Sequence, residues 1–214
     1  MGEIYRRFAH RYGVEVDSKN ITEAFSRSFR NQPPLAFPPG IPETDLYRRE
    51  RDWWRSLVYD VFINKRFLQF EDFFAEVFEY FRGEDAWQLF DDVIPTLTAL
   101  KGCGLRLAVI SNFDSRLDDL LRVLELDQFF EAIHISSRIG IAKPDAMIFI
   151  NALNHHAIEP SAALHVGDSM REDALGAAAA GIHSVLLDRA NKFFATEKVN
   201  RVSGLDQLVG LLGM

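Results

Sequence analysis

The sequence has a single cysteine, no long apolar run and an excess of acidic side chains, and each of these features excludes a class of protein. Cys103 cannot form a disulfide within the chain, and no second cysteine could share a metal ion with it. No window approaches eighteen uncharged apolar residues, and the first residues, MGEIYRRFAHRYG, have no apolar segment of signal-peptide type. The formal net charge of -7 argues against a partner such as nucleic acid or an anionic membrane, which needs a basic face. We therefore expect a soluble cytoplasmic protein, with Cys103 buried or half-buried among its apolar neighbours.

Residues 1–88 have the apolar spacing of a helical domain. Helical patterns cover residues 2–13, 18–32, 43–63 and 70–83, and five prolines between positions 33 and 42 interrupt them. Ser18 or Asn20 is expected to cap the second helix. The basic stretch YRRERDWWR (47–55) is interpreted as the solvent-exposed face of a helix. The many aromatic residues predict the core of a small helical bundle, although some rings could line a substrate pocket.

Residues 89–214 follow a different pattern, in which short apolar runs alternate with helical segments. The runs LRLAVIS (105–111), AIHIS (132–136), ALHVGD (163–168) and HSVLLD (183–188) predict strands. Strands that are apolar throughout and alternate with helices predict an α/β fold, a parallel, Rossmann-like sheet covered on both faces. Ligands bind such sheets at the carboxyl ends of the strands, and polar residues follow several of these runs, among them Ser136 and Ser137.

The side chains at the predicted strand ends form a candidate site for an anion and a metal ion. Ser111 and Asn112 follow the first run and could bind phosphate oxygens through a hydroxyl and backbone N–H groups, although both residue types also cap helices. Lys143 precedes a proline, which fixes its direction of approach, and it could neutralise an anion. Asp168 follows a glycine and is suited to Mg²⁺, or alternatively caps the next helix. Asp173 could orient Lys143 or the metal site.

The stretches VISNFDSRL, GIAKPDAMIF and HVGDSMREDALGAAAAG resemble motifs two, three and four of the haloacid dehalogenase-like hydrolases, in order and in spacing. The resemblance implies a helical cap domain (1–88) on a Rossmann-like hydrolase core domain (89–214). It implies that Ser111 and the Asn112 backbone bind the transferring phosphoryl group and that Lys143 neutralises it. It also implies that Asp168 holds a Mg²⁺ cofactor, and that Asp173 supports the metal and Lys143 as a further catalytic and metal-site residue. The fourth motif resembles that of the Mg²⁺-dependent phosphatases more than that of the metal-independent dehalogenases.

The first motif of the family, a strand that ends in the nucleophilic aspartate, has no counterpart in the sequence. No Asp-x-Asp pair occurs, and the first aspartate, Asp17, follows a helical pattern rather than an apolar strand. In the family this strand lies in the centre of the sheet, between the strands that end at Ser111 and Asp168. We therefore expect that the first, central strand is missing, that the natural chain begins roughly 15–25 residues earlier, and that the chain as printed is inactive and poorly stable.

Three functions from different classes remain open on the sequence. The first is a Mg²⁺-dependent phosphatase of a small phosphorylated metabolite that works through an aspartyl-phosphate. The second is an inactive relic that binds Mg²⁺ and phosphate, or a protein partner. The third is an unrelated doubly wound protein such as a receiver-type signalling domain, which would need an acidic pair near its first strand. The substrate, the cap residues that select it and the oligomeric state cannot be read from the sequence.

Overall fold

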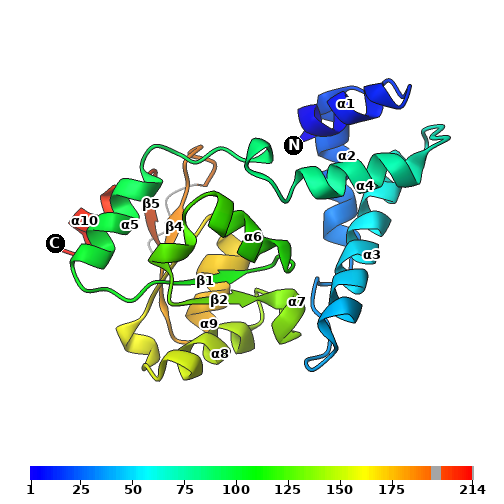
Figure 1. Cartoon of the computed structure of the whole chain (residues 1–214). Helices are drawn as coiled ribbons and strands as arrows, with labels where there is room; N and C mark the ends of the chain where they lie inside the picture. Colours follow the sequence, from blue (N-terminus) through cyan, green and yellow to red (C-terminus); the bar gives the residue numbers. More distant parts are fainter. Residues whose placement is uncertain (194–198, 214) are drawn as a thin grey trace.

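The computed structural model describes residues 1–193 and 199–213, which form two parts lying side by side (Figure 1). The first part is a helical bundle made of α1 (Gly2–Arg11), α2 (Ser18–Asn31), α3 (Glu43–Phe62) and α4 (Phe70–Tyr80). Apolar residues recur every three or four positions along these helices, so each helix buries one face. The buried faces share one core in which Leu57 and Phe73 are 0% exposed and Phe62 and Phe73 meet edge to face. The predicted aromatic core of the bundle is therefore confirmed.

The start of α2 differs from the prediction. Asp17, not Ser18 or Asn20, precedes the first helical turn, and its carboxylate accepts a hydrogen bond of 2.9 Å from the backbone N–H of Asn20. The extended backbone of Asp17 allows this, with φ -87° and ψ 133°. Its oxygen satisfies a backbone donor that has no partner within the helix, and its charge suits the positive end of the helix dipole.

Two side chains differ from the prediction in their exposure. Glu50 lies in the stretch 47–55 that was interpreted as a solvent-exposed face, yet it is only 1% exposed. Its position on α3 explains this, because Glu50 shares a helix face with the buried Leu46, Trp53 and Leu57. Cys103 is exposed rather than half-buried, because it ends a helix at the surface and leads into a turn.

The second part is an α/β unit in which every strand pair is parallel. Short 3₁₀ turns accompany it and the linker before it: η1 (Glu84–Ala86), η2 (Asp127–Phe129) and η3 (Pro160–Ala162). The predicted boundary at residue 88 falls between η1 and the first element of this unit. In chain order the elements are α5 (Val93–Gly102), β1 (Ala108–Ser111), α6 (Arg116–Val123), β2 (Ala132–Ile135), α7 (Ser136–Ile139), α8 (Ala146–His156), β3 (Leu164–Gly167), the π-helical turn η4 (Met170–Leu175), α9 (Gly176–Ala179), β4 (His183–Leu187), β5 (Asn200–Val202) and α10 (Gln207–Leu211).

Helices cover both faces of the strands, as predicted. Val109 packs with α6 and Leu97 of α5 on one face, whereas its neighbour Ile110 packs with Phe149 of α8 and Ala177 of α9 on the other. Successive residues of a strand point to opposite faces, which is why a strand covered on both sides is apolar at every position. The α/β, Rossmann-like fold class is confirmed, and β5 is an addition that the sequence pattern did not predict.

The described strands form two sheets rather than one, with orders β1-β2 and β3-β4-β5. A cavity of about 600 Å³ separates them, and Ala108 and Ile110 of β1 line it together with Leu164 and Val166 of β3. This cavity explains why β1 and β3 are only partly buried, with Ala108 and Leu164 exposed. That a central strand is missing stays a prediction, and its bearing on function is taken up below.

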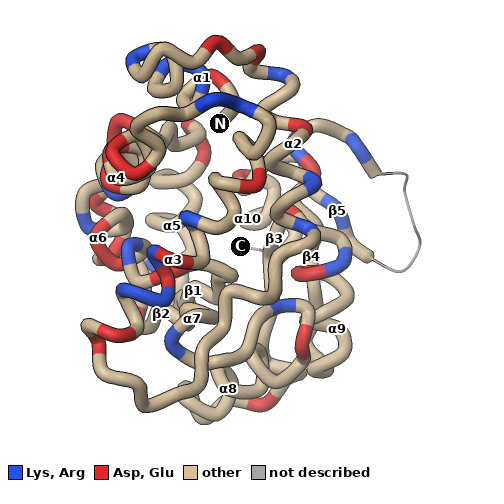
Figure 2. The backbone as a smooth tube through the Cα atoms, turned by 90° about the vertical axis from the view of Figure 1, so that its right-hand side faces the viewer, with Lys and Arg blue, Asp and Glu red and all other residues tan. Residues whose placement is uncertain are grey.

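Charged residues of both signs are spread along the backbone of the helical part rather than gathered in one region for each sign (Figure 2). Several form pairs within one helix or between neighbours, such as Arg55 with Glu71. Exposed pairs of this kind contribute little to stability. Among the described helices, none combines the length and apolar character needed to cross a membrane.

Candidate active site

The candidate residues of the second part lie where its strands end. Ser111 is the last residue of β1, and Asp168 directly follows β3. Lys143 lies in the loop before α8, and Asp173 lies in η4, the tight turn that follows β3. Turns with π-helical hydrogen bonding are rare and frequently occur at functional sites. The fold therefore brings segments that are far apart in the sequence to the carboxyl ends of two neighbouring sheets.

Asp173 is the centre of the polar contacts at this edge. Its Oδ1 lies 2.6 Å from the ammonium nitrogen of Lys143 and 3.0 Å from Nε2 of His165. Its Oδ2 accepts a hydrogen bond of 2.9 Å from the backbone N–H of Ser169. Burial alone would raise the pKa of the Asp173 carboxyl, but the hydrogen bond from His165 and the Lys143 charge overcome burial and hold that pKa well below its usual range.

Lys143 is fixed from two directions. Besides its ion pair with Asp173, its backbone is held by the side chain of Asn112: the Asn112 amide donates to the Lys143 carbonyl at 2.8 Å, and the Lys143 N–H donates to the Asn112 carbonyl oxygen at 2.7 Å. The Lys143 side chain is 12% exposed, so its ammonium remains within reach of an anion. The Asn112 side chain thus positions Lys143, a contact that the sequence pattern did not indicate.

The carboxylates around Lys143 fit part of a metal site. Asp168 is exposed, whereas both oxygens of Asp173 are occupied by donors from the protein. Glu172 is half-buried, and burial raises its pKa more than the nearby Lys143 lowers it. No cluster of three His, Cys, Asp or Glu suited to a metal ion occurs among the residues that the structure describes. A Mg²⁺ ion at Asp168 stays a prediction. Such an ion needs only one or two carboxylates, because water and substrate phosphate supply its other ligands.

Gly167 is required by the position of Asp173. A Cβ atom added at Gly167 would lie 2.2 Å from Cγ of Asp173, a distance at which the carboxylate must move. His165 and Gly167 are two apart in β3 and so share one face of the strand, the face against which Asp173 packs. This alternation is a signal by which His165, which the sequence analysis missed, could have been found.

Replacing Gly167 by alanine is expected to displace Asp173 and to lower the free energy of unfolding by about 1–3 kcal/mol, the usual cost of overpacking. Urea denaturation followed by circular dichroism measures this effect. The matched control is Gly102→Ala at the end of α5, where an added Cβ meets nothing within 4 Å, so stability should hold or rise slightly. Equal stability of the two variants would show that the Asp173 side chain is not held at the Gly167 position.

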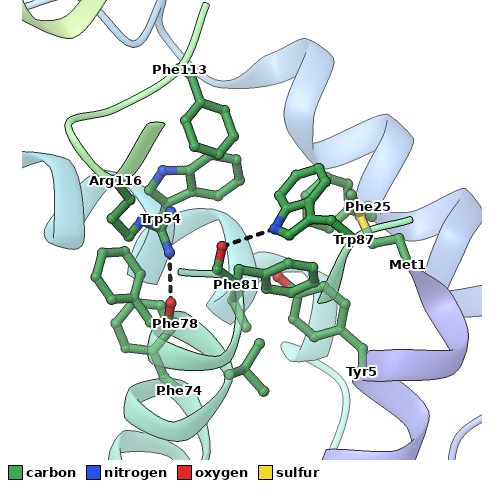
Figure 3. Close-up of a pocket in the computed structure, with 12 residues that line it drawn as sticks. Met1, Tyr5, Phe25, Trp54, Phe74, Phe78, Phe81, Trp87, Phe113 and Arg116 are labelled. Atoms are coloured by element: carbon green, nitrogen blue, oxygen red, sulfur yellow. Dashed lines mark hydrogen bonds between the residues drawn. The ribbon is translucent and has the colours of Figure 1, made fainter. Parts of the chain in front are cut away.

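An aromatic pocket lies where the helical part meets the second part (Figure 3). Its volume is about 70 Å³, and its lining includes Trp54 and Phe78 of the bundle, Trp87 of the linker, and Phe113 from the loop after Ser111. Trp87 donates to the carbonyl of Phe81 at 3.0 Å. The pocket is smaller than the ~150 Å³ that accommodates a benzene ring in a protein core.

Comparison with known proteins gives one consistent result. A family model described as haloacid dehalogenase-like hydrolase matches residues 3–181. The chain is 35% identical over 195 residues to haloacid dehalogenase-like hydrolase domain-containing protein 3 of Mus musculus, a match that covers 87% of this chain and 74% of that protein. It is 38% identical over 101 residues to the glyceraldehyde 3-phosphate phosphatase of Methanopyrus kandleri, covering 47% of this chain and 43% of that protein.

Solved structures share the fold. The magnesium-bound crystal structure of the putative HAD-hydrolase YfnB from Bacillus subtilis superposes with a TM-score of 0.75 at 17% sequence identity, covering 99% of this chain and 90% of that one. At this identity the likeness establishes the fold alone. It agrees with the helical part and the parallel α/β part described above.

Proposed function

The chain belongs to the haloacid dehalogenase-like hydrolases, and from this premise we propose that it provides the site of a Mg²⁺-dependent phosphatase for a small phosphate monoester. The observation that carries the proposal is the ion pair between Lys143 and the buried Asp173 at the strand ends, 2.6 Å long. The pair holds a cation at the carboxyl edge of a parallel sheet, where such folds bind ligands. The name of the Methanopyrus kandleri relative, a phosphatase, supports the same reaction class.

The charges around Lys143 favour a phosphate ester bound together with a divalent cation. The Lys143 ammonium pairs with Asp173, and the half-buried Glu172 is affected by the charges of Lys143, Asp173, Arg171 and Asp168. Three carboxyl groups and two cationic groups therefore lie in this region, so the site is not positive without a metal ion. A phosphate dianion approaching this edge would meet net repulsion, which a bound Mg²⁺ removes. In the proposal the exposed Asp168 supplies an oxygen ligand for that ion. A dehalogenase acting on a singly charged acid without metal would have no use for this set of carboxylates.

Each residue has a role in the proposal. Ser111 and the Asn112 backbone donate hydrogen bonds to the phosphoryl oxygens, and Lys143 neutralises the charge that they share. Asp173, with both oxygens engaged, keeps Lys143 charged and in place rather than binding the metal directly. Mg²⁺, when bound at Asp168, supplies the positive charge that brings two anionic groups together.

The nucleophile is a carboxylate that we place on a strand pairing between β1 and β3. The sequence contains no Asp-x-Asp pair to supply it. A rise of 3.3 Å per residue, a strand spacing of 4.8 Å and a sheet spacing of 10 Å give a strand of five residues a volume on the order of 800 Å³. This volume is comparable with the cavity of about 600 Å³ between the two sheets. Such a strand would bring a carboxylate to the edge that holds Ser111 and Asp168. The carboxylate then displaces the alcohol of the ester from phosphorus to form an aspartyl-phosphate, and water hydrolyses this intermediate to inorganic phosphate and the free carboxylate.

The test compares the printed chain of 214 residues with the same chain carrying an N-terminal extension. The extension consists of five apolar residues, an Asp-x-Asp sequence and a connecting loop. We expect the printed chain to show no turnover of p-nitrophenyl phosphate, since charge neutralisation without a nucleophile has a modest effect on rate. The extended chain should hydrolyse it only with Mg²⁺, and Asp168→Asn in that chain should abolish both the activity and its metal dependence.

The controls separate the alternatives. An extension whose first aspartate is replaced by asparagine should fill the cavity without restoring turnover. Hydrolysis that persists in excess chelator would contradict the role of the metal ion. Robust turnover by the printed chain would contradict the claim that the nucleophile lies on the added strand. If the extended chain binds phosphate and Mg²⁺ but never turns over, the protein is the relic that the sequence left open.

A further inference from the structure

A buried glutamate of the helical part reaches into the second part. Glu50, on α3, is 1% exposed. Helix α3 passes beside α7 (Figure 1), and Glu50 contacts Ser137 of α7. Its Oε1 accepts hydrogen bonds from the Ser115 N–H at 3.0 Å, from the Ser115 hydroxyl at 2.8 Å and from the Ser137 hydroxyl at 2.5 Å. Ser115 ends the loop that follows β1, and Ser137 follows β2. One carboxyl group of the bundle therefore holds the loop after β1 and the helix α7 that directly follows β2.

Ser115 belongs to the loop that carries the candidate phosphate-binding groups. This loop begins at Ser111 and Asn112, and its backbone passes through Phe113, which lines the aromatic pocket. Because Glu50 holds the far end of the loop, movement of the helical part away from the strand ends would release the loop as well. The contacts of Glu50 thus connect the position of the bundle with the geometry around Ser111.

The charges that surround Glu50 do not balance an ionised carboxylate. Its Oε2 is buried and has no hydrogen-bond partner in the described part of the chain. Two cationic groups lie nearby, but their donors are directed elsewhere. Arg116 donates to the Asp114 carboxylate and to the Phe78 carbonyl, and Arg138 donates to the Ser115 hydroxyl and pairs with Asp118.

The remaining charged neighbour works against ionisation. Asp114 is 0% exposed, and its charge adds to the cost of placing a second negative charge at Glu50. Burial raises the pKa of the Glu50 carboxyl, and this effect exceeds the opposing effect of the hydrogen bonds from Ser137 and Ser115. A buried carboxylate without a bonded cation is unfavourable, whereas a neutral carboxyl group in the same place costs less.

We propose that Glu50 is a positioning residue that docks the helical part onto the Ser111–Ser115 loop in its neutral, protonated form. The role of that loop rests on the proposed function; the proton-dependent docking itself does not. The direction of the pH effect follows from linkage. The docked state binds the Glu50 proton more tightly than the undocked state does. Docking is therefore strongest at pH values below the ordinary Glu pKa of about 4.3. It weakens as the pH rises through the raised pKa of the docked state.

The test measures hydrogen exchange of the Ser115 amide by NMR between pH 4 and pH 8, because this amide donates directly to Glu50. In the natural sequence its protection factor should fall by up to about tenfold per pH unit between the ordinary and the raised pKa of Glu50, and then level off. Glu50→Gln, which is neutral and of the same shape, should keep the protection at every pH. Glu50→Ala should remove it throughout.

The matched control is Glu43→Gln, an exposed glutamate on the same helix, which should titrate like the natural sequence. If Glu50→Ala does not fold, the comparison of the natural sequence with Glu50→Gln still shows whether the protection of the Ser115 amide depends on ionisation of Glu50. Protection that does not change with pH in the natural sequence would overturn the proposal. So would a Glu50→Gln variant that loses protection, because the ionised form would then make the contact. Neither measurement involves substrate, so failure of the phosphatase assay leaves this result independent.

Discussion

Replacing Asp173 by asparagine is expected to lower the free energy of unfolding by about 3–5 kcal/mol at neutral pH, the usual cost of breaking a buried ion pair. Asp173 is 3% exposed, and its carboxylate faces Lys143, His165 and the Ser169 N–H. An amide in its place would leave the Lys143 ammonium, whose side chain is only 12% exposed, without a negatively charged partner. Urea denaturation of the two proteins at pH 7 measures the loss.

The pH dependence of this difference has a definite sign. The pKa of Asp173 is lowered in the folded chain, so its contribution is fully present above the ordinary Asp value of about 3.9 and is lost as the pH falls toward the lowered one. The gap between the natural sequence and Asp173→Asn should therefore be constant from pH 7 to about pH 5 and close in strong acid. Asp168→Asn, an exposed position directly after β3, is the control and should change stability by less than about 0.5 kcal/mol. A loss of equal size in both variants would show that the ion pair is not the cause.

Replacing Asp114 by asparagine is expected to have an effect of similar size, about 3–5 kcal/mol, and to loosen the two parts from each other. Asp114 accepts hydrogen bonds from the backbone N–H and the guanidinium of Arg116, at 2.9 Å and 2.7 Å, and from the indole N–H of Trp54. Arg116 is 4% exposed and stacks on Phe78 of α4 at 3.7 Å. Without Asp114 the guanidinium would remain buried and unpaired between the bundle and the second part.

Urea denaturation measures the stability lost in Asp114→Asn. The fluorescence of Trp54, obtained as the difference between each protein and its Trp54→Phe variant, reports the separation of the parts. The matched control is Asp119→Asn on α6, whose partner Arg122 is 66% exposed. An exposed pair of this kind contributes about 0–1 kcal/mol. If Asp114→Asn is no less stable than Asp119→Asn, then the stacking of Arg116 on Phe78 holds the interface without the carboxylate.

The strand and helix order was predictable because each element carries its own pattern. The apolar run that ends at Ser111 and the run that ends at Gly167 became β1 and β3, and the proline-rich segment from Pro33 to Pro42 separates α2 from α3. Boundaries were less predictable, since β1 begins at Ala108 rather than at Leu105. Apolar patterns predict which side chains are buried, but they do not predict the residue at which the backbone hydrogen bonds of a strand begin.

The partners of the site residues were harder to predict than the residues themselves. His165 and Glu50 were missed because each occupies a position where an apolar residue was expected, His165 in a buried strand and Glu50 in the apolar face of α3. The position of a charged residue within an apolar face is itself a signal of a buried partner, and at Glu50 the spacing from Leu46 and to Trp53 and Leu57 carried that signal. What the spacing could not give is the partner, because Ser115 lies 65 residues away in the sequence.

A strand that bound in the cavity between β1 and β3 would make the stability of this fold depend on the concentration of that strand. Anything that binds the folded chain there and not the unfolded one stabilises it by RT ln(1 + [L]/Kd), about 2.7 kcal/mol at a hundred times Kd. A strand supplied as a free peptide would make the melting temperature rise with peptide concentration. The same strand joined to the chain acts at an effective concentration in the millimolar range, so its contribution becomes independent of dilution. If a strand fills this cavity, its covalent linkage to the chain would make the stability independent of concentration, whereas a separate strand would make it depend on how much of that strand is present.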